Sequence, residues 1–296
     1  MTDERTSTSG LALGILAYGT WGVIPLYWKQ LGHVGAGEIL AHRVLGALVV
    51  GVLLLLGTGR LRATSAILGD ARSMRTMLTS TALIAGNWGL FIWAVVTGHL
   101  AEASLGYFIN PLLNALLGRV ALGERLSRGQ LLALASSAIG VLWLATTSER
   151  PPWVALALAM SFALYGLVRK QAKAGALEGF AIEAGLVAPF ALAFLLTRTP
   201  TFGAMVAGDA RTRLLLLGAG VVTAVPLIAF ASAARRLRYT TLGMLQFLAP
   251  TLQLGCAVLL FGEPFSGRFA VAFAWIGLGA LIFLADAVRR ERRAMG

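Results

Sequence analysis

The feature that most constrains the fold is a series of ten apolar segments separated by short loops. They cover residues 10–28, 37–57, 76–97, 101–122, 129–147, 151–168, 177–197, 212–234, 240–262 and 268–287. Each is about as long as the 17 to 25 residues that a helix needs to cross the hydrocarbon core of a bilayer. The segments lack the alternating polarity of transmembrane barrel strands. The pattern therefore predicts an all-α membrane protein with ten transmembrane helices.

Composition supports a chain that lies mainly in lipid. Apolar residues make up 57% of the 296 residues and charged residues only 13%, whereas soluble domains have roughly 45 to 50% apolar residues. The first apolar segment follows a short tail of mixed charge and has no cleavage site of small residues. This indicates a retained span and not a removed signal peptide.

The second half of the chain repeats a pattern of the first half. Pro111 precedes Glu124 by thirteen residues, and Pro250 precedes Glu263 by thirteen residues. At the same offset of 139, further residues of the first half align with identical or similar residues of the second: Leu113 with Leu252, Asn114 with Gln253, Gly123 with Gly262 and Ser127 with Ser266. Each half holds five segments, and this odd number gives the two copies opposite orientations in a membrane. We therefore predict two inverted five-helix repeats, at residues 10–147 and 151–287.

The distribution of basic residues predicts the orientation of the chain. If the N-terminus is cytoplasmic, 18 of the 25 Lys and Arg residues lie on the inner side, 6 lie on the outer side, and Arg43 lies within a span. The positive-inside rule then places both termini in the cytoplasm. This placement also explains the net charge of +12 without nucleic acid, because no basic patch outside the spans is interleaved with aromatic residues. The expected partners are the lipid bilayer and a small-molecule substrate.

A longer inner stretch, residues 60–75, combines four arginines with apolar residues. It is either an amphipathic segment on the anionic membrane surface or a solvated basic connector. The sequence alone is compatible with both alternatives.

Motifs of catalysis, metal binding and ATP use are missing from the sequence. Cys256 is the only cysteine, and His33, His42 and His99 have no metal-ligand spacing. No Walker A or Gly-x-Ser-x-Gly element is present. We therefore expect no enzyme, no catalytic residue, no metal and no cofactor.

Glu124 and Glu263 lie at opposite mouths of the predicted membrane fold. Each closes one span and precedes the next, whose N-terminal dipole favours a nearby carboxylate. Capping of that next helix is the expected role of both residues, and gating is the alternative.

Ionisable residues inside spans are the first candidates for function, because a buried charge in lipid is costly. Arg43 and Glu183 lie about six residues, or roughly 9 Å, deep in the second and seventh spans. Arg43 is a candidate counter-ion for an anionic substrate, with snorkelling to the outer rim as the alternative. Glu38, His42 and Glu183 are candidates for taking up a coupling proton, although a lone histidine is often structural. A direct Arg43–Glu183 pair stays open, since roughly 12 Å separates their levels in the membrane.

Polar and aromatic residues in the spans form a second set of candidates. Interhelical hydrogen bonding is the ordinary use of such polar groups, and a ligand role is the alternative. Besides Arg43, the predicted substrate-binding residues are Asn87, Trp88, Tyr107, Asn110, Gln246, Trp21 and Tyr165. Trp28 could wall a cavity together with Trp21, Trp88, Trp93 and Tyr165. It is rather expected in the interfacial aromatic belt, because Tyr27 and Lys29 flank it at the end of a span.

Several stretches carry a resemblance to a known family. They are Tyr18-Gly19-Thr20-Trp21-Gly22, Glu38-Ile39-Leu40-Ala41-His42-Arg43, Gly106-Tyr107-Phe108-Ile109-Asn110-Pro111, Gln246-Phe247-Leu248-Ala249-Pro250 and Gly262-Glu263-Pro264-Phe265. With them the chain resembles the EamA family of the drug/metabolite transporter superfamily, and within it the RarD branch. The resemblance covers nearly the whole chain and implies a permease of the bacterial cytoplasmic (inner) membrane with two EamA-type repeats. The chain departs from the branch at Gly46, where a bulky aromatic is common, which predicts a roomier pocket beside Arg43.

These observations predict a secondary-active transporter that exports a small metabolite or drug by alternating access, with the proton as a candidate coupling ion. One alternative is uptake or exchange of an amino acid or carboxylate, and another is a membrane sensor that binds without transport. Either a monomer or a homodimer is expected.

Overall fold

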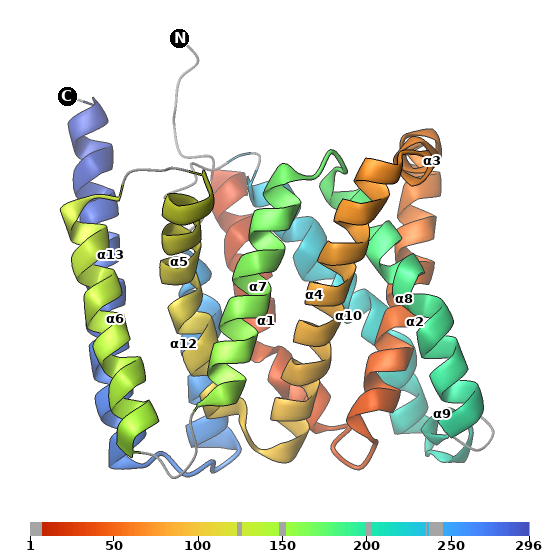
Figure 1. Ribbon diagram of the computed structural model, residues 1–296. Coiled ribbons are helices and arrows are strands. Elements are labelled where there is room, and N and C mark those ends of the chain that lie inside the picture. Colours follow the sequence, from red (N-terminus) through yellow and green to blue (C-terminus); the bar gives the residue numbers. More distant parts are fainter. Residues whose placement is uncertain are drawn as a thin grey trace.

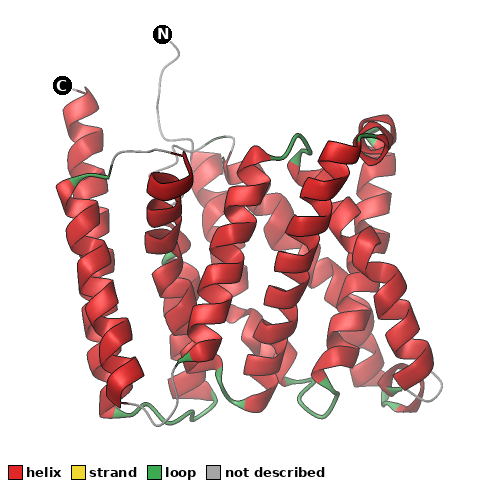
Figure 2. Cartoon of the chain, in the orientation of Figure 1, coloured by secondary structure: helices red, strands yellow, loops and turns green. Residues whose placement is uncertain are grey.

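The computed structural model describes residues 8–122, 126–147, 152–198, 203–234, 236 and 245–295. Within these ranges every regular element is a helix (Figures 1 and 2). The elements are α1 (Thr8–Lys29), α2 (Ala36–Gly57), α3 (Leu61–Gly69), α4 (Ala71–Thr97), α5 (Leu100–Leu122), α6 (Arg128–Thr147), α7 (Trp153–Gln171), α8 (Ala176–Arg198), α9 (Ala204–Ala207), α10 (Ala210–Ala234), α12 (Leu248–Gly255), the π-helix η2 (Cys256–Leu260) and α13 (Gly267–Met295). The prediction of an all-α protein is confirmed.

Seven of the described helices, α1, α2, α4, α6, α8, α10 and α13, are long and apolar enough to cross a membrane. Two further apolar helices are shorter, namely α7 and the continuous stretch of α12 and η2. Large apolar side chains such as Val120, Phe190 and Leu259 are exposed on the outside of the bundle. Such a surface suits lipid and not water. The chain is a multi-pass membrane protein.

The basic stretch at residues 60–75 contains the short helix α3 at one end of the bundle, opposite α9 (Figure 1). We call these the α3 end and the α9 end. Ile67 packs against Met77 and Ile182 of the bundle, while Leu61 and Leu68 stay exposed. Of residues 60–75 only Arg60 and Asp70 lie outside a helix, because α4 already begins at Ala71. One apolar side of α3 packs on the protein and another side is exposed. In Figure 1 α1 begins and α13 ends at the α3 end.

The helices form two groups of three that are built alike. In the first trio α7 packs on α4 and α5, and in the second trio α1 packs on α10 and α12. Between them α2 and α8 pack on each other, with α2 also on α10 and α8 also on α4. The pair α6 and α13 lies at one side (Figure 1). These principal packing pairs stay the same if each helix is exchanged for a counterpart: α1 for α7, α2 for α8, α4 for α10, α5 for α12 and α6 for α13.

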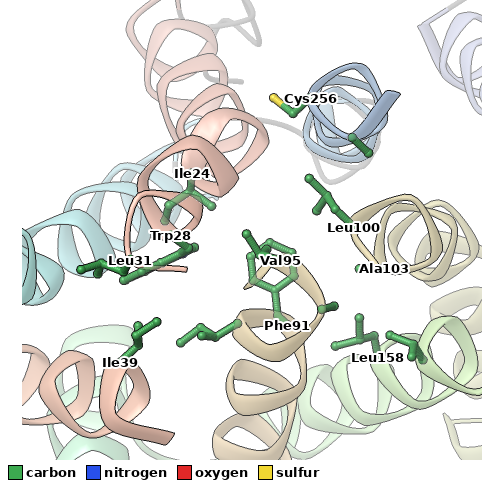
Figure 3. Close-up of a cluster of buried hydrophobic side chains, with 14 of the residues drawn as sticks. Ile24, Trp28, Leu31, Ile39, Phe91, Val95, Leu100, Ala103, Leu158 and Cys256 are labelled. Carbon is green, nitrogen blue, oxygen red and sulfur yellow. The ribbon is translucent and has the colours of Figure 1, made fainter. Parts of the chain in front are cut away.

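Trp28 lies in the core of the bundle and not in an interfacial belt. Its side chain is fully buried and packs in one cluster with Phe91 and Val95 of α4 (Figure 3). Ile24, Trp28 and Leu31 share one side of the chain because they are spaced by four and three residues. This inward face overrides the signal of the flanking polar residues, so the interfacial expectation is wrong.

Gly46 serves close contact between helices and not a larger pocket. A Cβ atom at Gly46 would lie 3.0 Å from both the Cα and the nitrogen of Gly220 on α10. Small residues allow helix backbones to approach in this way. The prediction of extra space at Gly46 is wrong, because the backbone of α10 fills it.

Glu263 caps a helix, but not the helix that follows it. The backbone N–H groups of Leu100 and Ala101 donate to its two carboxylate oxygens at 3.0 and 2.8 Å. These groups begin α5, whereas the next helix in the chain is α13. Gly262, with φ +63, turns the chain toward α5. Glu124 lies outside the described residues.

Candidate functional site

Arg43 lies inside the bundle, where it touches three other helices. Its Nε donates to Thr223 Oγ1 of α10 at 3.1 Å. Its guanidinium carbon lies 4.4 Å from the ring centroid of Trp88 in α4 and 5.4 Å from that of Trp28 in α1. The side chain is only 6% exposed, so it does not snorkel to the rim. A hydroxyl and two indole faces surround the cation, and such faces attract a guanidinium.

No carboxylate among the described residues forms an ion pair with Arg43. A buried charge with no counter-charge is costly unless something neutralises it. The guanidinium also keeps donors beyond the one that Thr223 accepts, in a fork that matches a carboxylate. This arrangement suits an anionic group placed beside Trp88 and Trp28.

Asn87 and Tyr107 form a hydrogen-bonded group in the first trio. Tyr107 Oη donates to Asn87 Oδ1 at 3.1 Å. Asn87 Nδ2 donates to the Leu158 carbonyl at 3.0 Å and to Ser161 Oγ at 2.9 Å. The Asn87 amide thus takes the interhelical role and joins α4 to α5 and α7.

Glu183 has the same place in α8 that Arg43 has in α2. Both follow a glutamate by five residues, Glu38 in α2 and Glu178 in α8, and both helices start two residues before that glutamate. Glu183 is 2% exposed. The two buried charges form no ion pair with each other, which settles the pairing that the sequence left open.

Three neighbours surround the Glu183 carboxylate. Ser80 Oγ of α4 donates to Oε1 at 2.8 Å, and Tyr165 Oη of α7 donates to Oε2 at 3.2 Å. Arg169 Nε of α7 lies 3.7 Å from Oε1. Glu183 therefore has a counter-charge and hydroxyl donors within the protein.

Glu38 and His42 meet at the α9 end. Glu38 Oε1 accepts a hydrogen bond from the backbone N–H of Ala204, the first residue of α9, at 2.6 Å. His42 Nε2 lies 3.9 Å from the same oxygen. This nitrogen is buried and has no hydrogen bond from any described residue. Glu38 is thus engaged in capping, while the imidazole keeps one free nitrogen.

The remaining predicted ligands form no hydrogen bond or cation–π contact with Arg43 within the described chain. Trp21 packs edge-on against Tyr18 and near Phe230. Asn110 is fully buried, and neither of its amide atoms is hydrogen-bonded in the part of the chain that the structure covers. Gln246 is half-buried just before α12. The structure thus places Trp88 on Arg43, joins Tyr107 to Asn87, which precedes Trp88, and places Tyr165 with Glu183.

Sequence reasoning missed three residues of these two charged sites, Thr223, Ser80 and Arg169, and it favoured the interfacial belt for Trp28. The predicted repeat offered a partial signal: the equivalent positions of Arg43 and Glu183 predict equivalent flanking helices, α10 and α4, but not the residues of those helices that contact the charges. In the described ranges no group of three or more His, Cys, Asp or Glu residues could hold a metal ion.

The bundle and its buried polar site are typical of membrane transport proteins, and similar sequences support this class. The family described as EamA-like transporter family matches residues 8–146. One crystal structure of a protein superposes on 96% of this chain and 99% of its own length with a TM-score of 0.63. At 22% identity this likeness supports the fold alone.

Relatives of nearly equal length define the branch. Protein RarD of Streptomyces exfoliatus is 42% identical across 99% of this chain and 94% of that protein. Protein RarD of Escherichia coli (strain K12) is 40% identical across 98% and 99%. The chloramphenicol-sensitive protein RarD of Pseudomonas aeruginosa is 31% identical across 98% of both. The chain belongs to the EamA family of the drug/metabolite transporter superfamily, as a RarD-like permease.

Proposed function

We propose that the protein is a secondary-active transporter that moves a small metabolite or drug by alternating access between two inverted five-helix repeats. The symmetric exchange of packing pairs supports the division at residues 10–147 and 151–287. The equivalent positions of Arg43 in α2 and Glu183 in α8 support it independently. In this arrangement α1, α2, α4 to α8, α10, the α12–η2 segment and α13 are the ten spans.

The proposed orientation places the α3 end and both termini in the cytoplasm. The connection around α3 carries Arg60, Arg62, Arg72 and Arg75. Basic loops of this kind stay on the inner side of a membrane. The bacterial relatives favour the cytoplasmic membrane as the location.

One observation carries the proposed site: buried Arg43 has indoles and a hydroxyl around it but no counter-anion among the residues that are described. An anionic group of the substrate would complete it, because a carboxylate can accept two hydrogen bonds from one guanidinium. The substrate class that fits is therefore a carboxylate or a zwitterion, with Trp88 beside it; Tyr107 stays a prediction as a ligand. Asn87, Asn110, Gln246, Trp21 and Tyr165 stay predictions as ligands.

Coupling to protons is the second part of the proposal, since no ATP-binding motif is present in the sequence. Glu183 is the best-placed carboxylate, because Arg169, Ser80 and Tyr165 hold it inside the membrane region. Protonation of Glu183 would release Arg169 from its counter-charge. Glu38 and His42 are the alternative pair, at the other end of the bundle.

The test is a thermal-shift screen of the purified protein against carboxylates, zwitterions and antibiotics. Ligands that bind the folded state raise its apparent stability. A true substrate should shift the wild type and leave Arg43→Ala unshifted, although the unliganded variant stays folded. An equal shift in both proteins would remove Arg43 from the site.

Flux of the identified ligand then separates transport from the alternatives. Measurements in reconstituted vesicles with defined pH and substrate gradients show the direction in which the ligand moves. They distinguish export from uptake or exchange of an amino acid or carboxylate. Binding with no flux in either vesicle orientation would instead indicate a sensor.

A further inference from the structure

Glu263 connects the two trios at the α9 end of the bundle. It follows η2 of the second trio, and its carboxylate accepts hydrogen bonds from Leu100 and Ala101 at the start of α5 in the first trio. Glu263 is only 8% exposed. Its two acceptor oxygens meet the positive end of the α5 dipole, where a carboxylate is most strongly stabilised.

Glu102 provides a comparison with Glu263 within the same protein. Both carboxylates accept hydrogen bonds from backbone N–H groups at the start of a helix, but the helices they connect are different. Its Oε1 accepts a hydrogen bond from the backbone N–H of Val154 at the start of α7, at 2.9 Å. Glu102 lies on α5, so both ends of this contact belong to the first trio. The α9 end thus has one carboxylate cap between trios and one within a trio.

The chain just before Glu263 is shaped so that its carboxylate reaches α5. The segment ends in the π-helix η2, and the backbone N–H of Glu263 donates to the Ala257 carbonyl at 2.9 Å. Between them Gly262 adopts a φ of +63, which other residues rarely tolerate. π-helical turns are frequent at functional sites. This irregular end turns the chain back over η2, toward the first trio.

Apolar packing lies beneath the Glu263 contact. Leu100 and Ala101 share one core cluster with Cys256 and Ala257 (Figure 3). Close by, Ser104 Oγ of α5 donates to the Pro250 carbonyl of α12 at 2.7 Å. Separation of the trios at this end must break the carboxylate contact and expose this packing.

We propose that Glu263 is a gating latch: it holds the trios together at the α9 end, and its release opens that end. The proposal rests on the alternating-access function, and it assigns the closing contact to one carboxylate. Glu102 does not gate, because α5 and α7 move together. By the orientation proposed above, the latch closes the outer side.

The only cysteine of the chain is a natural reporter of this opening. Cys256 is 5% exposed and lies in the cluster under the latch. The experiment measures the rate at which a membrane-impermeant maleimide labels Cys256 in sealed right-side-out vesicles, with Cys256→Ser as the control for the reagent. It needs no substrate, so its result is independent of whether any ligand is transported.

In Glu263→Gln the charge-assisted contact is lost, and we expect labelling about tenfold faster than in the wild type, which corresponds to ~1.4 kcal/mol in the opening equilibrium. Glu102→Gln, with the same chemical change, should label at the wild-type rate. Ser104→Ala, which keeps Glu263 intact, should give a smaller acceleration and serves if Glu263→Gln accumulates poorly.

Three results would overturn the latch. One is a wild-type rate in both Glu263→Gln and Ser104→Ala. Another is equal acceleration in Glu102→Gln, which would mean general loosening of the α9 end. A third is equal acceleration in inside-out vesicles, which would mean loosening of the whole bundle. None of these depends on the thermal-shift or flux results, so the latch and the transport proposal fail separately.

Discussion

Arg43 and Glu183 occupy equivalent places in the two halves and have opposite charges. Each forms a hydrogen bond with a hydroxyl group of an equivalent helix. Arg43 donates to Thr223 of α10, and Glu183 accepts from Ser80 of α4. The two sites differ in whether a neighbouring side chain neutralises the buried charge. Glu183 has the Arg169 guanidinium beside it, whereas Arg43 has no carboxylate within the described chain.

Two similar packing arrangements thus surround two buried charges of opposite sign, and within the described chain only Glu183 has a counter-charge. Under the proposed function, Glu183 with its Arg169 partner is the site for a proton, and Arg43 is the site for an anionic substrate.

The largest expected effect comes from removing Arg169, the counter-charge of Glu183. Arg169→Ala leaves the Glu183 carboxylate buried without its counter-charge, and removing one partner of a buried pair costs about 3 to 5 kcal/mol in the free energy of unfolding. Denaturant unfolding in detergent micelles measures it. The double variant Arg169→Ala/Glu183→Gln should recover most of the loss. Arg43→Ala should cost much less, because it leaves no opposite charge behind; an equal loss would contradict the comparison.

The next largest effect is expected on proton coupling through Glu183. Glu183→Gln keeps the shape of the side chain but cannot take up a proton, so the pH dependence of substrate flux should flatten. Flux in vesicles over a range of pH, with the substrate identified by thermal shift, measures this. An unchanged pH profile would remove Glu183 from coupling and direct attention to Glu38 and His42.

The smallest effect concerns the two hydroxyls. Thr223→Val removes the acceptor of the Arg43 Nε–H and should weaken substrate binding by about 1 kcal/mol, the typical net value of one hydrogen bond. Ser80→Ala is the matched change at Glu183 and should leave substrate affinity unaltered while it changes the pH profile. Titration of the thermal shift gives both affinities. Loss of affinity in Ser80→Ala alone would reverse the roles of the two sites.

The positions of several long apolar helices were predictable to within one residue at each end. The expected spans 37–57, 129–147 and 177–197 correspond to α2, α6 and α8. The reason is physical: a membrane fixes the length of an apolar helix, and lipid enforces helical hydrogen bonding. Prolines at positions 25, 111, 189 and 226 lie inside helices without ending them.

The faces of the helices were not predictable in the same way. A helix that is apolar all round gives no signal for the side that packs inward. For this reason Thr223 and Arg169 could not be connected to the buried charges from the sequence, and the neighbours Tyr27 and Lys29 were the only local signal for Trp28, in favour of the interface. Arg43 and Glu183 were found because a charge in lipid is conspicuous whichever way it points. Glu263 was expected to cap the next helix, but the N–H groups that it accepts from begin α5, 163 and 162 residues earlier in the chain, which local sequence cannot indicate.

The contact between Gly46 and Gly220 ties the geometry of the Arg43 site to the packing of α2 on α10. Each glycine lies three residues from a partner in the Arg43–Thr223 hydrogen bond. In this structure a Cβ atom at either position would meet the backbone of the other glycine, so a larger residue fits only if α2 and α10 move apart. Such a movement would also draw Thr223 away from Arg43. A lineage that carries a larger residue at either position must therefore hold the arginine with a different spacing of these two helices.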